Sequence, residues 1–313
     1  MDFPIKPIFL LADSQLLFSR DNDPPFLERV KGCLADQEIK AAYIGASNDD
    51  NPDFFSIFEA AMDNIGVTNP RMILSSYGEE DQEYLKEANL ILLAGGDVAK
   101  GWKIIDETGM AKDLIQRYYG GAVLIGVSAG AVQLGLKGAK TEEPHSDEDL
   151  VETFKLIPFL VDAHDENNRW TRLKKMVRAA DSYTKGLAIP SGGGLIYHED
   201  HTIEPVRKPL TEFARTEDRK EITETLLLPP EKGSDGAEMI QEPAKKKAAE
   251  PGADSGAKRS KKPANKKKAA ESGAGSGAKR SKKPANKKKA KTAKAREPLT
   301  DKELPVFQAE IIR

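Results

Sequence analysis

The sequence contains a single cysteine, Cys33, so the chain can form no internal disulfide bond. The residues around it, Phe26–Leu34, have the spacing of an amphipathic helix, in which we expect Cys33 to pack as a small apolar side chain. No apolar run approaches the roughly 20 residues that span a bilayer, and the N-terminus lacks the basic start and long apolar core of a secretory signal. These absences predict a soluble cytoplasmic protein.

Histidine is scarce as well, with four residues in the chain. No group of His and Cys residues has the spacing of metal ligands. We therefore expect neither a metal ion nor another cofactor.

The formal net charge of −2 results from two opposite contributions. Ala244–Arg296 contains 20 Lys and Arg residues against 3 Asp and Glu residues, a net charge of +17. The rest of the chain contains the remaining 28 basic and 47 acidic residues, a net charge of −19. The sequence therefore predicts an acidic globular part joined to a strongly basic segment.

The basic segment is a tandem repeat. Lys245–Asn265 and Lys266–Asn286 are 21-residue copies that differ at two positions, and a third copy begins at Lys287. The copies lack aromatic and large aliphatic residues, so they cannot form a hydrophobic core, and we expect this segment to be disordered. Its charge would bind DNA or RNA phosphates without sequence preference. Alternatively, it is a solubilising spacer that folds back on the acidic part.

Residues 1 to about 210 alternate short apolar runs with helical patterns. The runs predict strands at Pro7–Ala12, Ala41–Gly45, Arg71–Ser75, Leu90–Ala94 and Ala122–Val127. The helical patterns fall at Phe54–Ile65, Asp81–Ala88 and Met110–Tyr119. Apolar strands that alternate with helices indicate a mostly parallel sheet covered on both faces, and hence an α/β fold with a three-layer α/β/α sandwich.

Three further strands are expected at Gly186–Ile189, Leu195–His198 and Thr202–Val206, the last two joined as a hairpin by the turn Glu199–His201.

We therefore divide the chain into an α/β/α domain at residues 1–228, a disordered Lys/Ala-rich segment at 229–298 and a final strand within 299–313. Val306–Ile312 is the candidate for that strand, and Thr223–Leu228 is the candidate for its neighbour in the sheet.

The first candidate for chemistry is the G-x-S-x-G motif Gly126–Gly130, which follows an apolar strand and opens a helix. In a nucleophile elbow the turn at the serine is strained, and glycine is needed on both sides because the next elements crowd it. The strain would hold the Ser128 hydroxyl at the top of the sheet, where the amides of the outgoing helix point at an oxyanion. The alternative is an ordinary strand-to-helix turn of small residues.

A serine nucleophile needs a base. The apolar segment Leu156–Ala163 leads directly to His164, which places this histidine at a strand end and makes it the favoured candidate for the base. A structural role for His164 is the alternative. His145, His198 and His201 lie in polar loops or turns.

A second glycine motif, Gly95–Gly96–Asp97, follows the strand Leu90–Leu93 directly. Adjacent glycines at the carboxyl end of a strand let backbone amides approach a ligand. Gly96 could therefore donate one amide to an oxyanion, with Ala129 donating the other. The alternative is a tight turn in which Asp97 caps the next helix.

These motifs, in this order, resemble the peptidase E and cyanophycinase family of serine peptidases, which is related to the class I glutamine amidotransferase fold. The stretches that carry the resemblance are Tyr43–Ser47, Leu93–Asp97, Gly126–Gly130, and Asp162–His164 followed by Arg169–Leu173. The resemblance covers roughly residues 7–206, and the interval of 36 residues from Ser128 to His164 also suits the family. The amidotransferases have cysteine at the position of Ser128.

The resemblance implies that Ser128 is the nucleophile, that His164 is the base, and that Gly96 and Ala129 supply the amides of the oxyanion hole. Asp97, in the same loop as Gly96, is a candidate for substrate binding.

The third member of the triad is less well defined by the resemblance. Glu143, 15 residues after Ser128, lies close to where an acidic residue occurs in peptidase E, and Glu142 is an equally available neighbour. Relatives also have acidic residues after the late G-[IL]-x-[IL] strand, where this chain has Pro190 and Ser191.

Arg169 and Arg172 could bind a substrate carboxylate through bidentate hydrogen bonds, or could be solvated helix charges. Asp162 could orient the loop around His164. The sequence thus predicts a serine hydrolase that cleaves short, acidic peptides or related amides through an acyl-enzyme. The alternative is a catalytically degenerate peptidase-like module that binds a ligand and is localised on nucleic acid by the basic segment.

Overall fold

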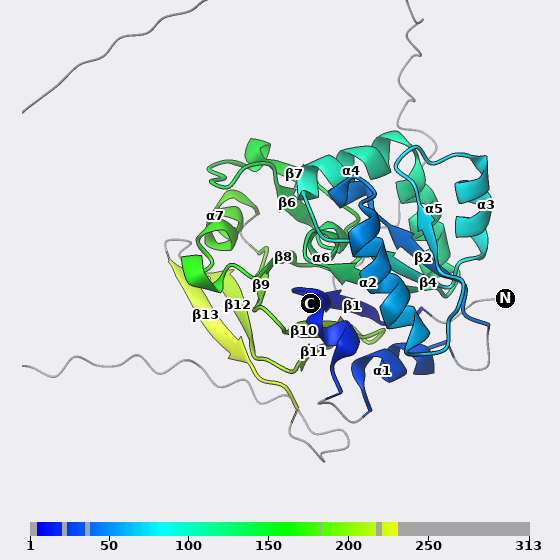
Figure 1. Ribbon diagram of the computed structural model, residues 1–313. Coiled ribbons are helices and arrows are strands. Elements are labelled where there is room, and N and C mark those ends of the chain that lie inside the picture. Colours follow the sequence, from blue (N-terminus) through cyan, green and yellow to red (C-terminus); the bar gives the residue numbers. More distant parts are fainter. Residues whose placement is uncertain (1–4, 21–23, 35–37, 182, 217–220, 231–313) are drawn as a thin grey trace, which may run out of the picture. The chain divides into compact units, whose positions relative to one another are not determined.

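The computed structural model describes residues 5–20, 24–34, 38–181, 183–216 and 221–230 (Figure 1). The basic repeat and the expected final strand at Val306–Ile312 lie outside the described residues.

Seven strands form the main sheet, in the order β11-β10-β1-β5-β4-β2-β3. The five strands from β1 to β3 in this order run parallel, and β10 and β11 are an antiparallel hairpin added beside β1. All seven were predicted from the sequence, each to within two residues at either end. Their bounds are β1 (Ile8–Leu11), β2 (Ala41–Ile44), β3 (Arg71–Ile73), β4 (Leu90–Leu93), β5 (Val123–Val127), β10 (Gly194–Tyr197) and β11 (Ile203–Val206).

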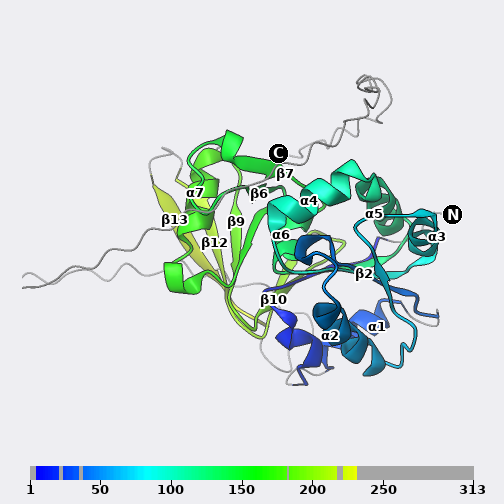
Figure 2. The same cartoon turned by 45° about the horizontal axis from the view of Figure 1, so that its top comes forward.

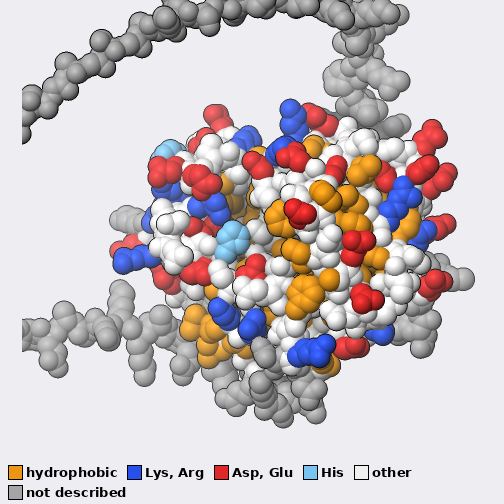
Figure 3. Space-filling view, in the orientation of Figure 1, with side chains coloured by type: hydrophobic (Ala, Val, Ile, Leu, Met, Phe, Trp, Pro, Cys, Tyr) orange, Lys and Arg blue, Asp and Glu red, His pale blue; other side chains and the backbone are white. Residues whose placement is uncertain are grey.

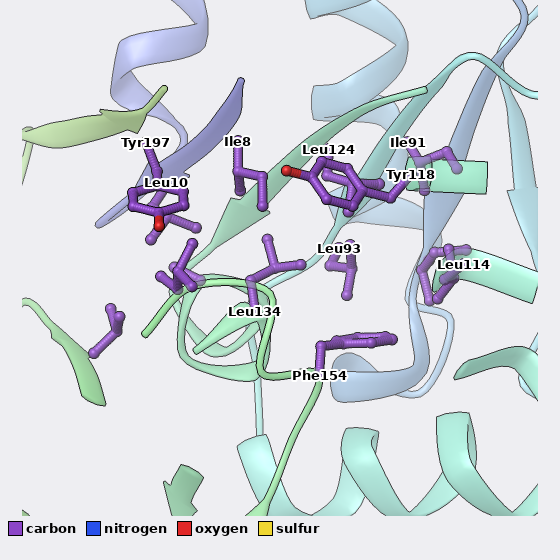
Figure 4. Close-up of a cluster of buried hydrophobic side chains, with 14 of the residues drawn as sticks. Ile8, Leu10, Ile91, Leu93, Leu114, Tyr118, Leu124, Leu134, Phe154 and Tyr197 are labelled. Carbon is purple, nitrogen blue, oxygen red and sulfur yellow. The ribbon is translucent and has the colours of Figure 1, made fainter. Parts of the chain in front are cut away.

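Helices cover both faces of this sheet because successive side chains of a buried strand point to opposite faces. Ile8 and Leu10 of β1 join one hydrophobic core, which Figure 4 shows with Leu114 and Leu134 of the covering helices. The neighbouring Phe9 joins the core on the opposite face. Figure 2 shows α1 and α2 on one side of the sheet and α4, α5 and α6 on the other. The expected three-layer α/β/α sandwich is confirmed.

The helices of these two layers include the three expected from the helical patterns. The α-helices are α1 (Phe26–Gly32), α2 (Pro52–Asp63), α3 (Glu79–Glu87), α4 (Val98–Glu107), α5 (Met110–Tyr119) and α6 (Ala129–Leu134). Short 3-10 helices are η1 (Ser14–Phe18), η2 (Ala46–Asn48), η3 (Asp147–Asp149) and η4 (Glu166–Asn168). Cys33 follows α1 and packs, partly buried, against the core beside it, and this burial raises the pKa of its thiol.

A second, four-stranded sheet in the order β13-β12-β9-β8 lies next to the sandwich. Its strands are β8 (Leu160–Ala163), β9 (Gly186–Ile189), β12 (Leu210–Arg215) and β13 (Ile222–Leu227), and α7 (Thr171–Ala179) covers one face through a separate small core. The other face contributes Val161 and Leu187 to the core of the main sheet. β6 (Lys137–Ala139) and β7 (Leu150–Glu152) form a hairpin of their own. The sequence analysis did not predict β12. β13 corresponds to the candidate strand Thr223–Leu228, and it pairs with β12.

The topology brings together the ends of several strands and the loops that follow them. The carboxyl ends of β1, β4 and β5 meet at one edge of the main sheet because these strands are parallel neighbours. β8 reaches the same region from the second sheet. Among the residues that the structure describes, no helix combines the length and the apolar character that a membrane crossing requires.

Candidate active site

Ser128 occupies a sharp turn between β5 and α6. Its backbone has φ 50° and ψ −109°, a conformation that non-glycine residues rarely adopt. The Ser128 amide donates a hydrogen bond of 2.9 Å to the carbonyl oxygen of Leu11, at the end of the neighbouring strand β1. This bond fixes the turn to the edge of the sheet, with the hydroxyl at the end of the strands.

The glycines on either side of Ser128 are required by close packing. A Cβ atom on Gly126 would lie 2.7 Å from the Cα atom of Ala131, and one on Gly130 would lie 2.1 Å from the carbonyl oxygen of Leu93. Both distances are far below a van der Waals contact, so only glycine lets α6 approach β5 and β4 this closely. The G-x-S-x-G pattern therefore has a steric cause in this fold.

His164 is the residue that the structure brings to Ser128. The Ser128 hydroxyl oxygen and His164 Nε2 are 2.7 Å apart. His164 comes directly after β8, as the apolar segment before it predicted, and its amide donates a 2.9 Å hydrogen bond to the carbonyl of Ile189 on β9. This hydrogen bond attaches His164, whose backbone has a positive φ of 48°, to the second sheet. Two sheets thus each supply one member of the Ser–His pair.

The Gly95–Gly96 loop lies beside this pair. Gly96 has φ 140°, and a Cβ atom there would lie 2.0 Å from the carbonyl oxygen of Ser47 in η2. That carbonyl accepts a 2.8 Å hydrogen bond from the Asp97 amide, which fixes the loop against η2. Within the described part of the chain, the Gly96 and Ala129 amides donate no hydrogen bond. Both residues line the same cavity as Ser128, so their amides are available to an oxygen atom there.

Asp97 and Arg172 are occupied by contacts within the protein. Asp97 Oδ1 accepts a 2.8 Å hydrogen bond from the Lys100 amide and so caps α4, while the residue also lines the cavity. Arg172 donates through Nε and Nη2 to Asp162, at 3.2 and 2.6 Å, and through Nη1 to Glu142 at 3.1 Å. Burial raises the pKa of the Asp162 carboxyl, and Arg172 opposes this shift. The guanidinium of Arg172 is therefore shared between two carboxylates.

Arg169 and Glu143 do not contribute to the cavity. Arg169 is exposed and lies outside the cavity lining. Glu143, the expected third member of the triad, is 73% exposed and pairs with Lys175 of α7 at 3.5 Å. The loop after β6 runs along α7, so Glu142 and Glu143 both face basic residues of that helix and not His164. The structure does not bring Glu143 to the Ser–His pair.

Glu166 is an acidic residue near His164 that the sequence analysis did not single out. It begins η4, two residues after His164, and its Oε1 atom accepts a 3.2 Å hydrogen bond from the Ser191 amide. Its Oε2 atom is buried and has no hydrogen-bond partner among the described residues. Burial raises the pKa of the Glu166 carboxyl, but hydrogen bonding from Ser191 and from the backbone, with the charge of His164, holds this pKa below its usual value.

One indirect signal for Glu166 is present in the sequence. Ser191 stands where the family resemblance expects an acid, so an acidic residue close to His164 is a candidate for that place. Asp165 and Glu166 both follow His164 closely, and only the fold shows that Glu166 turns toward Ser191 on the neighbouring loop.

Two cavities meet at the Ser–His pair. The larger, of about 670 Å³, is lined by charged residues that include Lys140, Glu142, Asp162 and Arg172. The smaller, of about 260 Å³, is lined mainly by apolar side chains. Ser128, His164 and Gly96 line both. Figure 3 shows hydrophobic side chains gathered on this face, over α2 and its neighbours.

No group of three or more His, Cys, Asp or Glu residues could hold a metal ion among the residues described here. The site consists of a serine, a histidine, backbone amides and carboxylates. Such a set can attack a carbonyl carbon, transfer a proton and stabilise an oxyanion.

Comparisons with known proteins identify similar sequences and folds. The sequence profile of peptidase family S51 matches residues 8–204, nearly two thirds of the chain. Among solved structures, a peptidase from an acI-B1 Actinobacterium is similar in fold, with a TM-score of 0.51 and 14% sequence identity over 78% of this chain and 96% of that chain. A putative peptidase E protein from Listeria monocytogenes EGD-e has a TM-score of 0.48 and 17% identity over 64% of this chain and 98% of that chain. No curated protein sequence matches.

Proposed function

The chain belongs to peptidase family S51, and we propose that it is a serine peptidase in which Ser128 is the nucleophile and His164 the general base. The observation that carries this proposal is the distance of 2.7 Å between the Ser128 hydroxyl oxygen and His164 Nε2. A hydroxyl at hydrogen-bond distance from an imidazole can lose its proton to it as it attacks a carbonyl.

The reaction follows from the positions of these groups. The Ser128 oxygen attacks the carbonyl carbon of the scissile bond while its proton passes to His164 Nε2. The oxyanion of the tetrahedral intermediate accepts hydrogen bonds from the Gly96 and Ala129 amides. Collapse of the intermediate breaks the C–N bond, and the leaving amine takes the proton from His164. Water then attacks the acyl-enzyme with His164 again as base, which releases the acid and restores Ser128.

Glu166 is the positioning residue for His164 in this proposal. Glu166 lies two residues after His164, and its buried Oε2 atom has no hydrogen-bond partner among the described residues, so this oxygen can accept one from the His164 ring. The hydrogen bond from the Ser191 amide also supports this role, because the carboxylate then lies beside the residue that stands in place of the family's expected acid. A carboxylate of this kind fixes the tautomer of the base and stabilises the imidazolium that forms.

We propose short peptides or related amides as substrates. The larger cavity, about 670 Å³, is of a size for a ligand of a few residues. The expected preference for acidic peptides has little support, because Arg172 is shared between Asp162 and Glu142 and Arg169 lies outside the cavity.

The alternative of a degenerate binding module rested on the missing acid at Pro190 and Ser191. Glu166, in contact with the Ser191 amide, supplies a carboxylate at that place and supports an active enzyme instead.

Hydrolysis of a panel of dipeptides, tripeptides and isoaspartyl peptides tests the proposal. The wild-type chain should cleave at least one class, and Ser128→Ala and His164→Ala should each lose this activity while keeping the melting temperature of the wild type to within a few degrees. Hydrolysis that persists in Ser128→Ala would rule the mechanism out.

A further inference from the structure

We propose that the smaller cavity is the specificity subsite and that it binds an apolar aliphatic or aromatic side chain of the residue beside the scissile bond. This inference rests on the proposed function, since it takes Ser128 as the point where the substrate carbonyl lies. Ser128 and His164 line this cavity as well as the larger one, so a substrate at the Ser–His pair has one flank in each.

The lining of the smaller cavity is suited to an apolar group. Leu17 of η1 and Phe54, Ile57 and Phe58 of α2 contribute to it, together with the ring of Tyr43. Each square ångström of apolar surface that leaves water stabilises the complex, so an aliphatic or aromatic side chain gains affinity here.

Two polar side chains of this cavity, Asp13 and Asn48, are already paired within the protein. Asp13 accepts hydrogen bonds from the amides of Gly192, at 2.7 Å, and Gln15, at 2.9 Å. Asn48 Nδ2 donates to Tyr43 and to the Gly95 carbonyl, both at 3.0 Å. Among the described residues that line the cavity, none is Lys or Arg. An acidic side chain would therefore find no Lys or Arg partner there and would lie beside the carboxylate of Asp13, and burial of an unpaired charge is costly.

The size and the rim of the cavity support the same occupant. Its volume of about 260 Å³ is below the range of about 300–1,000 Å³ that holds drug-sized ligands, so it suits one side chain and not several residues. At its mouth, Phe54 is 52% exposed and Ile57 is 36% exposed. Large apolar side chains that remain exposed beside a candidate active site indicate a surface that a ligand covers.

Binding to the Ser128→Ala chain tests the subsite apart from catalysis. Blocked tripeptides that differ in one residue, Leu, Phe, Ala or Asp, at each position in turn are titrated by calorimetry. At one of the two positions beside the scissile bond, we expect the Leu or Phe peptide to bind about tenfold or more tightly than the Asp peptide, because burial of such a side chain gives a gain of that order. Equal or tighter binding of the Asp peptide, or no binding of any peptide, overturns the inference.

A matched pair of variants in the Ser128→Ala background locates the subsite. Ile57→Lys adds a cation at the mouth of the cavity without opening the core, since Ile57 is exposed. In this variant the ratio of the affinities for the Leu or Phe peptide and the Asp peptide should fall by about tenfold, because the added cation attracts the Asp side chain. Leu226→Lys, an exposed apolar position on β13 outside the cavity lining, should leave the preference unchanged. An unchanged preference in Ile57→Lys overturns the inference.

The two proposals can fail separately in these experiments. If the wild-type chain hydrolyses no peptide, the proposed peptidase function is contradicted. The binding measurement is made on the Ser128→Ala chain and does not depend on hydrolysis. Hydrolysis with no preference in binding for apolar residues contradicts the subsite and leaves the peptidase in place.

Discussion

Ser128 has a backbone conformation that few residues with a side chain adopt, and the residues around it explain how the fold accommodates this. Its amide is bonded to Leu11, its hydroxyl contacts His164, and glycines at positions 126 and 130 let α6 pack directly on the strands. Strain of this kind persists only where the surroundings fix it, and it commonly occurs at functional sites.

Gly130→Ala should destabilise the protein by about 1–3 kcal/mol, because the added methyl group would overlap the Leu93 carbonyl and force α6 away from β4. Denaturant unfolding measures this change. Gly32→Ala is the control: nothing lies within 4 Å of its Cβ position, in α1, so this variant should be as stable as the wild type or slightly more stable. Equal stability of the two variants would contradict the packing argument.

On the proposed positioning role, Glu166→Gln should lower kcat by roughly 100- to 10,000-fold with little change in KM, because an amide replaces the proposed carboxylate partner of His164 while the substrate contacts remain. The melting temperature should be nearly unchanged. Steady-state kinetics on a cleaved peptide measures both constants.

Asp165→Asn is the matched control for Glu166. Asp165 also follows His164 closely, but its carboxylate accepts a hydrogen bond from Asn168 at 2.8 Å. This variant should retain most of the activity. A larger loss of kcat in Asp165→Asn than in Glu166→Gln would assign the positioning role to Asp165.

At the scale of elements, the parts of the fold that the sequence predicts are those with a local signal. β4 and β5 are continuous apolar runs in which nearly every residue is buried. Such a run is typical of a strand that is covered on both faces of the sheet. β12, Leu210–Arg215, has only two buried positions, so its pattern is that of a surface segment and it was not predicted. The assignment of β8 and β9 to a second sheet depends on backbone pairing, which the apolar pattern does not encode.

The candidate site divides in the same way. Ser128 and His164 could be predicted because a short motif and a strand end identify them along the chain. Glu166 could not, because its position depends on Ser191, which is 25 residues away in sequence and adjacent only in the folded chain. Glu143 lies at the expected distance of 15 residues after Ser128 in sequence. The loop that carries it runs along α7, however, where Glu143 pairs with Lys175.

An ion-pair group connects the edge strand β11 to α1. Glu204 accepts hydrogen bonds from Arg29 at 2.8 Å and from His198 at 3.0 Å. Burial raises the pKa of the Glu204 carboxyl, but the hydrogen bonds and charges of His198 and Arg29 outweigh burial and hold the pKa at about 2. Because the folded pKa is below the unfolded value, this group stabilises the fold above the unfolded pKa of about 4.5, and the stabilisation is lost as the pH falls toward 2.

Glu204→Gln should therefore destabilise the protein near pH 7 by up to about 3 kcal/mol and should reduce the decline in stability between pH 4.5 and 2. Urea unfolding at a series of pH values measures this profile. Glu87→Gln, which removes an exposed carboxylate paired with Lys40, should change the acid side of the profile far less, because solvent screens an exposed ion pair. A wild-type profile in Glu204→Gln would show that this group does not stabilise the edge strand.

At the scale of the whole molecule, the sequence combines a part with a net charge of −19 and the segment Ala244–Arg296 with a net charge of +17. The hydrophobic cores that the structure describes are built from residues between Ile8 and Leu227. We propose that the basic segment, which lies outside the described residues, binds nucleic acid without sequence preference. The spacer interpretation is the alternative that the next measurement separates from it.

Deletion of Ala244–Arg296 should leave the melting temperature and the hydrolase activity nearly unchanged, because the described cores contain none of its residues. It should abolish salt-sensitive DNA binding, because it removes the basic charge that would contact the phosphates. Deletion of the single copy Lys266–Asn286 should weaken the binding and its salt dependence only in part. Fluorescence anisotropy of labelled DNA at several salt concentrations measures this. A full-length chain that binds no DNA at low ionic strength favours the spacer.

The central claim, that Ser128 is an activated nucleophile, is tested most directly by covalent labelling. A small fluorophosphonate should modify the wild-type chain once, and mass spectrometry of the digested protein should locate the adduct on Ser128 and on no other serine. Ser128→Ala should remain unlabelled, and His164→Ala should react far more slowly because the hydroxyl has lost its base. A wild-type chain that is not labelled, or a Ser128→Ala chain labelled as fast as the wild type, would contradict the account.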